Sequence, residues 1–168
     1  MITKKLEAAI NDQINAEFYS AYLYLSMSAY LESINLSGFA NWMRVQFQEE
    51  QFHAMKMYDY VIERGGAVTL AQIAAPPAQW DGPKSVFEAT LAHEQMVTGR
   101  VNDLVYLARD ERDNATEVFL QWFVNEQVEE ENTAETLLGN LKLIEGSPQA
   151  LFMLDRELGA RVFAPPTA

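Results

Sequence analysis

The chain has 168 residues, 49% of them hydrophobic, and a formal net charge of −12 from 24 acidic residues and 12 Lys and Arg. Length and composition suit one hydrophobic core, so we expect a single domain over residues 1–168. The absence of cysteine excludes disulfides, cysteine-ligated zinc or iron–sulfur sites and cysteine nucleophiles. An acidic surface without a basic stripe repels phosphate backbones, so we expect no nucleic-acid partner.

From its first residues, we expect the chain to have no targeting signal. Residues 1–13, MITKKLEAAINDQ, lack the apolar segment of a signal peptide, and no apolar run approaches the length of a membrane span. We therefore expect a cytoplasmic protein that does not bind membranes.

Prolines and apolar spacing predict four long helices. The six prolines lie at positions 76, 77, 83, 148, 165 and 166, which leaves two long stretches without a helix breaker. Apolar spacing in these stretches predicts helices near residues 5–34, 37–64, 84–111 and 115–144. Ser37 and Ser85 are placed to cap helix starts, and Gly65-Gly66 and Gly146 to end helices.

The connections predict the topology. Residues 67–83 are too long for a tight turn and fit a crossover between the second and third helices, so we expect a four-helix bundle over about 5–144. Ser147 and Pro148 begin a short fifth helix over about 148–159. A four-helix core does not need its apolar residues, so we expect another subunit to cover Leu151, Phe152, Leu154 and Leu158.

Each long helix interrupts its apolar seam with polar residues at the middle. Full heptad steps in the first helix give the seam Ile10, Glu17, Tyr24, Leu31. Alternating steps of three and four residues give the other three seams: Phe39, Met43, Gln46, Glu50, His53, Met57, Tyr60; Phe87, Leu91, Glu94, Thr98, Val101, Val105; and Leu120, Phe123, Gln127, Glu130, Ala134, Leu137, Leu141. One interior Glu usually means that the helix face is misassigned. Four helices with the same exception at the same level indicate a buried polar site.

The spacing repeats between the two halves of the chain. Glu50 follows Glu17 by 33 residues, and Gln127 follows Glu94 by 33; His53 and Glu130 come three residues later. Positions i and i+3 share a helix face, so each pair projects inward together.

Carboxylates buried in such a layer repel one another unless cations neutralise them. The pattern therefore predicts a dimetal carboxylate centre inside the bundle. Oxygen ligands with one imidazole suit Fe(II) or Mn(II); zinc can occupy such a site but is redox-silent.

With Glu17, Glu50-x-x-His53, Glu94 and Gln127-x-x-Glu130, the sequence resembles the ferritins, most of all the haem-free bacterial type, over essentially its whole length. The resemblance implies a 24-subunit shell with ferroxidase activity. Such a shell oxidises Fe(II) with O2 or peroxide and stores the ferric mineral inside.

The resemblance also implies roles for single residues. One iron is expected on Glu17, Glu50 and His53, and the other on Glu94 and Glu130, with Glu50 as the bridge. Beside these ligands, the family's pattern places Gln127 as a hydrogen-bond donor, Tyr24 as an electron or hydrogen-bond donor, and Trp122 near the centre.

A third iron position of bacterial members matches four acids, Glu49, Glu126, Glu129 and Glu130. Judged by residue types alone, the acidic run at 128–132 also fits a solvated helix face.

Gln51 stands where haem-binding relatives have a ligating Met, so no haem is expected. His93 lies about 100° around the helix from Glu94 and is expected to form a surface or interhelical hydrogen bond.

Two alternatives remain open at this stage. One is a small di-iron oxidase or peroxide scavenger that stores no mineral. The other is a helical assembly protein whose seam acids are structural, which predicts no tight binding of Fe(II).

Overall fold

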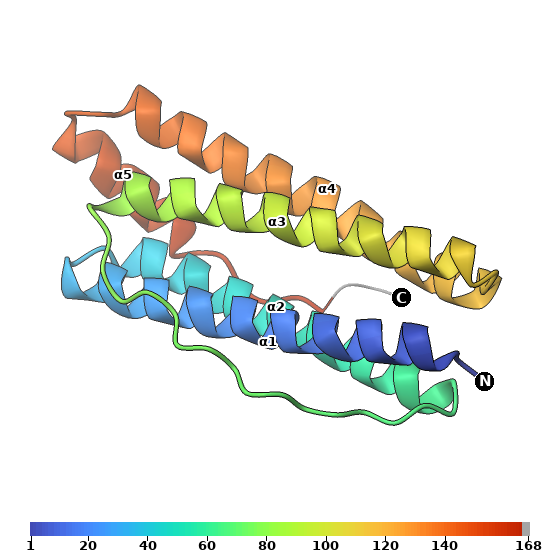
Figure 1. The fold of residues 1–168 in the computed structure, drawn as a ribbon. Helices are drawn as coiled ribbons and strands as arrows, with labels where there is room; N and C mark the ends of the chain where they lie inside the picture. Colours follow the sequence, from blue (N-terminus) through green and yellow to red (C-terminus); the bar gives the residue numbers. More distant parts are fainter. Residues whose placement is uncertain (166–168) are drawn as a thin grey trace.

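The computed structural model describes residues 1–165, which form five helices and no strands. The helices are α1 (Lys4–Ser33), α2 (Ser37–Glu63), α3 (Pro83–Asp110), α4 (Asn114–Leu143) and α5 (Pro148–Leu158). Each lies within one residue of its predicted bounds, so the all-α prediction is confirmed. In Figure 1, α1–α2 and α3–α4 form two antiparallel hairpins side by side, with α5 at one end. Over residues 1–165, no helix is long and apolar enough to cross a membrane.

Three helices begin at side-chain caps. The Thr3 side chain accepts a hydrogen bond from the Leu6 amide (3.3 Å) at the start of α1, and Asp113 accepts one from the Thr116 amide (3.0 Å) at the start of α4. The predicted cap of α5 is confirmed, because Ser147 accepts a bond from the Ala150 amide at 3.3 Å. These bonds satisfy amides that have no partner inside their own helix.

Two predicted caps and one predicted end are wrong. Ser37 is the first residue of α2, and its hydroxyl donates to Glu32 (3.0 Å) instead of capping the helix. Ser85 lies inside the first turn of α3, because Pro83 already begins that helix with its fixed φ. Gly146, at φ +80°, follows α4 by three residues, whereas Gly65, at φ +70°, directly follows the C-cap of α2 as predicted.

The crossover between α2 and α3 runs along the outside of α1 (Figure 1). Near its start, Asn11 donates to the Ala67 carbonyl at 2.9 Å and accepts from the Thr69 amide at 2.8 Å. Near its end, Ser26 donates to the Pro77 carbonyl at 2.6 Å. Polar side chains of α1 therefore attach an extended segment along the length of the bundle.

The apolar core has two separate parts. One cluster surrounds Tyr24, Phe39 and Phe87 and includes residues of α5. The other surrounds Ile10 and Phe123 at the opposite end of the seams. The predicted pattern of apolar ends and a polar middle is thus confirmed, and the polar middle lies between the two clusters.

Helix α5 packs on its own chain more than we expected. Leu154 and Leu158 are buried in the first cluster and Leu151 packs against it, whereas Phe152 is 61% exposed. The expectation that another subunit covers all four apolar residues is therefore wrong for three of them. The reason is that Asp155 caps α2 from α5 by accepting from the amides of residues 38 and 39 at 2.9 and 3.0 Å.

Gly38 is the residue that permits this close approach. An added Cβ would lie 1.6 Å from the Asp155 carbonyl oxygen, so Gly38→Ala should force α5 away and cost about 1–3 kcal/mol. Thermal unfolding of metal-free protein at one concentration measures this loss. The control is Gly99→Ala, where an added Cβ meets no atom within 4 Å. There the higher helix propensity of alanine should raise the free energy of unfolding by about 0.5–1 kcal/mol. Equal midpoints for the two variants would contradict the packing argument.

Candidate metal centre

The polar layer between the two apolar clusters is built by all four long helices. Glu17 of α1 and Glu94 of α3 are 1% exposed, Glu50 and His53 of α2 are 2% exposed, and Glu130 of α4 is 8% exposed. These five residues are therefore buried on the helix faces that the apolar spacing predicted. Each acid faces inward because apolar residues on the same helix face are buried in the clusters on both sides of the acid.

Three of these residues meet in a group of metal-binding size. One ligand atom each from Glu17, Glu50 and His53 lies within 4.8 Å of the other two. His53, Glu126 and Glu130 form a second such group. The two groups share His53, whose Nδ1 is 3.5 Å from Glu50 Oε2 and whose Nε2 is 4.0 Å from Glu126 Oε2.

Glu94 lies in the layer but is in neither group. Tyr24 donates its hydroxyl hydrogen to Glu94 Oε1, and Gln127 Nε2 donates to Glu94 Oε2 at 3.1 Å and to the Glu94 carbonyl at 3.2 Å. The structure thus places Gln127 and Tyr24 as hydrogen-bond donors beside the acids. It does not bring Glu94 and Glu130 together in one group of metal-binding size.

Two further amides, which we did not predict as site residues, bond the carboxylates. Gln13 Nε2 donates to Glu17 Oε1 at 2.8 Å, and Gln46 Nε2 donates to Glu130 Oε2 at 2.9 Å. Gln13 precedes Glu17 by four residues, a spacing that places both on one helix face and is a usable signal. Gln46 was already on the α2 seam, but its partner lies 84 residues away.

Burial makes the negative charge of this layer unfavourable. Burial, followed by the charges of Glu94, Glu17 and Glu130, raises the pKa of Glu50 well above its usual range. Burial is also the main cause that raises the pKa of Glu94 to about 8. Glu17 Oε2 and Gln46 Oε1 are buried and have no hydrogen-bond partner among residues 1–165. A layer with raised carboxyl pKa values and orphaned oxygens is one that a cation stabilises.

The acids predicted for a third iron have different surroundings. Glu126 is half-buried in the second group, and Glu129 is exposed. Glu49 pairs with Arg161, whose Nη2 lies 2.7 Å from Glu49 Oε2. Burial nevertheless raises the pKa of Glu49 to about 7, because desolvation outweighs the opposing effect of Arg161. The sequence contains no local signal for this pair, whose members are 112 residues apart.

Two further aromatic side chains, Trp122 and His93, lie near the polar layer. The ring of Trp122 lies edge-on to that of His53, with centroids 5.4 Å apart, which places Trp122 beside the centre as expected. His93 Nε2 lies 2.8 Å from the Ser20 hydroxyl oxygen, which confirms the expected interhelical hydrogen bond. His93 is absent from both groups of metal-binding size.

Comparison with known proteins identifies the family. The model of the ferritin-like domain matches residues 7–144. The bacterial non-heme ferritin of Bacteroides fragilis is 47% identical over 161 residues, which cover 96% of this chain and all of the relative. The corresponding Staphylococcus epidermidis protein is 42% identical over 163 residues, 97% of this chain and 98% of the relative.

Solved structures agree with this result. The open-pore ferritin of the hyperthermophilic archaeon Archaeoglobus fulgidus has a TM-score of 0.96 at 54% identity, covering 96% of this chain and all of that one. A closed form of the same ferritin, engineered by site-directed mutagenesis, gives 0.97 at 54% identity over 98% of this chain and all of that one. With a matching family model, relatives of nearly equal length and the same five-helix fold, the chain belongs to the ferritin family of iron-storage proteins.

Proposed function

We propose that this ferritin oxidises Fe(II) at a pair of metal positions within each subunit and that 24 copies enclose the ferric mineral. The observation that carries this proposal is the buried layer of carboxylates around His53. This layer lies between two apolar clusters. Within the described residues, no Lys or Arg forms an ion pair with Glu17, Glu50 or Glu94. A single domain over residues 1–168 and a cytoplasmic location stay predictions.

The donor set fits iron as the substrate. Carboxylate oxygens with one imidazole suit Fe(II) and leave room for an oxidant. Two Fe(II) each lose one electron, and the pair of electrons reduces one O2, with two protons, to hydrogen peroxide. Fe(III) then reacts with water to give oxyhydroxide and releases protons. The protein contributes a fixed pair of positions and a negative charge that attracts the cations.

We assign one iron to Glu17, Glu50 and His53, which already meet in one group. The other iron is assigned to Glu94 and Glu130, with Glu50 as the bridge. Because Glu94 now accepts bonds from Tyr24 and Gln127, binding a cation requires its carboxylate to share or replace one of them.

Aerobic loading tests storage directly. Metal-free protein is given a large excess of Fe(II), and the iron that co-elutes with the assembled protein is counted. We expect hundreds of iron atoms per assembly. Two or three per chain would support a di-iron oxidase or scavenger without mineral, and none would support structural acids.

Ligand removal tests the centre. Glu50→Ala and His53→Ala should slow Fe(II) oxidation at least about 10-fold, because even the partners of metal ligands cost 10–100-fold when removed. Glu50→Ala should also raise the thermal stability of the metal-free protein at neutral pH, since it removes a carboxyl group whose burial among other acids is unfavourable. The control is Glu63→Ala at the exposed end of α2. Oxidation at the wild-type rate in either ligand variant would contradict the assignment.

The raised carboxyl pKa values predict an unusual pH dependence for the metal-free protein. With the pKa of Glu94 raised from 4.5 to about 8, the folded state binds more protons than the unfolded state between these values. The contribution of Glu94 to the free energy of unfolding is therefore complete below about pH 4.5 and is lost as the pH rises to about 8. Urea midpoints should show a shallower decline with pH for Glu94→Gln than for wild type, and identical slopes would contradict the burial argument.

The third iron position overlaps an existing ion pair. We retain Glu49, Glu126 and Glu129 as its proposed ligands, together with Glu130. Glu49 already has a counter-ion, however, because Arg161 bonds it at 2.7 Å while its guanidinium lies 4.5 Å from the ring centroid of Trp42. A cation at this position must therefore compete with Arg161 for the same carboxylate.

Removing the competitor should strengthen the third position. A hydrogen bond to a charged group contributes about 1.5–3 kcal/mol, so Arg161→Gln should tighten the third Zn(II) equivalent by about 10-fold or more in calorimetric titration. Zn(II) is chosen because it is redox-silent. The control is Arg44→Gln, which removes a surface pair with Glu32. A third equivalent of unchanged affinity in Arg161→Gln would show that Arg161 does not compete.

A further inference from the structure

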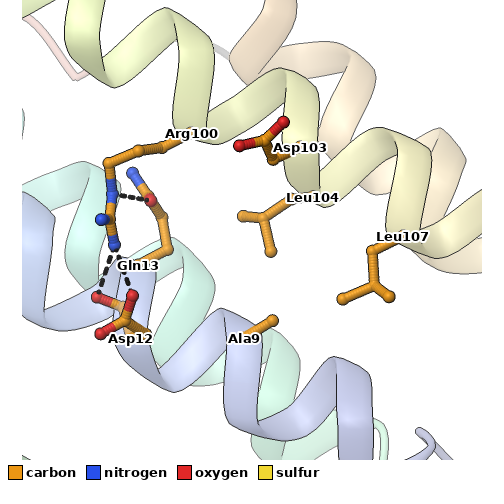
Figure 2. A pocket seen from close by; sticks show the side chains of 7 residues that line it. All are labelled: Ala9, Asp12, Gln13, Arg100, Asp103, Leu104 and Leu107. Carbon is orange, nitrogen blue, oxygen red and sulfur yellow. Dashed lines mark hydrogen bonds and ion pairs between the residues drawn. The ribbon is translucent and has the colours of Figure 1, made fainter.

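A side chain on the outer face of the bundle connects to the buried centre through one amide. Figure 2 shows Arg100 of α3 reaching across to Asp12 and Gln13 of α1. Its Nε donates to Gln13 Oε1 at 2.8 Å, and its Nη2 donates to Asp12 Oδ2 at 2.8 Å. Gln13 is 1% exposed, whereas the side chain of Arg100 is 34% exposed, so the contact runs from the surface into the core.

Arg100 determines which way the Gln13 amide faces. A guanidinium carries only donors, so Gln13 must present its oxygen to Arg100. The NH2 group of the amide is then turned inward, where it donates to Glu17 Oε1 at 2.8 Å. With the amide reversed, two donors would face each other and Glu17 would face an acceptor, so both bonds would be lost.

This bond selects one oxygen of Glu17. Oε1 is occupied by Gln13, and Oε2 is buried without a hydrogen-bond partner among the described residues. Glu17 is also the member of the first group that comes from α1, beside Glu50 and His53. A buried carboxylate oxygen with no partner is costly unless a cation binds it.

We infer that Gln13 and Arg100 are positioning residues that orient Glu17 so that Oε2 binds the cation of the first group. The inference rests on the proposed metal binding at Glu17, Glu50 and His53. Gln13 is neutral, so it fixes the carboxylate without cancelling its charge. Asp12 pairs with Arg100 at the surface, so the positive charge of Arg100 is compensated outside the centre.

The test is a calorimetric titration of metal-free protein with Zn(II). Gln13→Leu keeps the approximate size of the side chain and removes the amide. We expect the Zn(II) affinity of the position formed by Glu17, Glu50 and His53 to fall 10–100-fold, as is typical when a partner of a metal ligand is lost, and the other Zn(II) positions to remain unchanged. The control is Gln121→Leu, the same substitution at an exposed position of α4.

Arg100 variants separate positioning from packing. Arg100→Met should weaken the same Zn(II) position, and Arg100→Lys should bind closer to wild type because lysine can still donate to Gln13 Oε1. The control is Arg109→Met, which removes a surface ion pair of the same helix with Glu117. Arg100→Met also decides the question if Gln13→Leu fails to assemble.

The outcomes distinguish this inference from the proposed function. Wild-type Zn(II) affinities in both Gln13→Leu and Arg100→Met would overturn the positioning role, and so would a lower unfolding temperature without a change in Zn(II) affinity. A wild-type protein that binds no Zn(II) would instead overturn the metal centre itself.

Discussion

The structure depends on a concentration of buried carboxyl groups in the middle of a helical bundle. Four carboxylates lie there almost without solvent contact, and the groups that bond them are neutral. Gln13 donates to Glu17, Gln46 to Glu130, and Gln127 and Tyr24 to Glu94. Neutral donors fix the direction of each carboxylate but leave its charge uncompensated. Under the proposed function, cations from solution supply the compensating charge that these donors lack.

The rest of the fold supports this unfavourable layer. Apolar clusters above and below it bury the ends of every seam, so helix packing on both sides opposes the repulsion in the middle. Long helices suit this purpose, because one continuous helix contributes to both clusters and to the layer between them. The extra contacts of α5, including the cap that Asp155 provides for α2, strengthen the cluster around Phe39.

The helices and the polar layer could be predicted because both follow from regular spacing of residues along the sequence. Prolines, apolar spacing and the repeated Glu17–Glu50 interval were enough to place each helix within one residue and the four seam acids on the inner face. Contacts between distant side chains carry no periodicity. The pair of Arg161 with Glu49 and the cap from Asp155 therefore had no sequence signal. The family resemblance also led us to expect Tyr24 and Gln127 as hydrogen-bond donors beside the acids, and both donate to Glu94. The separation of Glu94 from the group that contains Glu130 was not expected.

Glu17 and Glu49 show how the same residue type can differ in its readiness for a cation. An arginine lies near each of them, but at Glu17 it acts through the neutral amide of Gln13, and at Glu49 it makes the ion pair itself. The amide transmits orientation and leaves the full charge of Glu17 available. The direct ion pair orients Glu49 and also neutralises it. We therefore expect a cation to bind more tightly at Glu17, where the arginine acts through an amide, than at Glu49, where the arginine bonds the carboxylate directly.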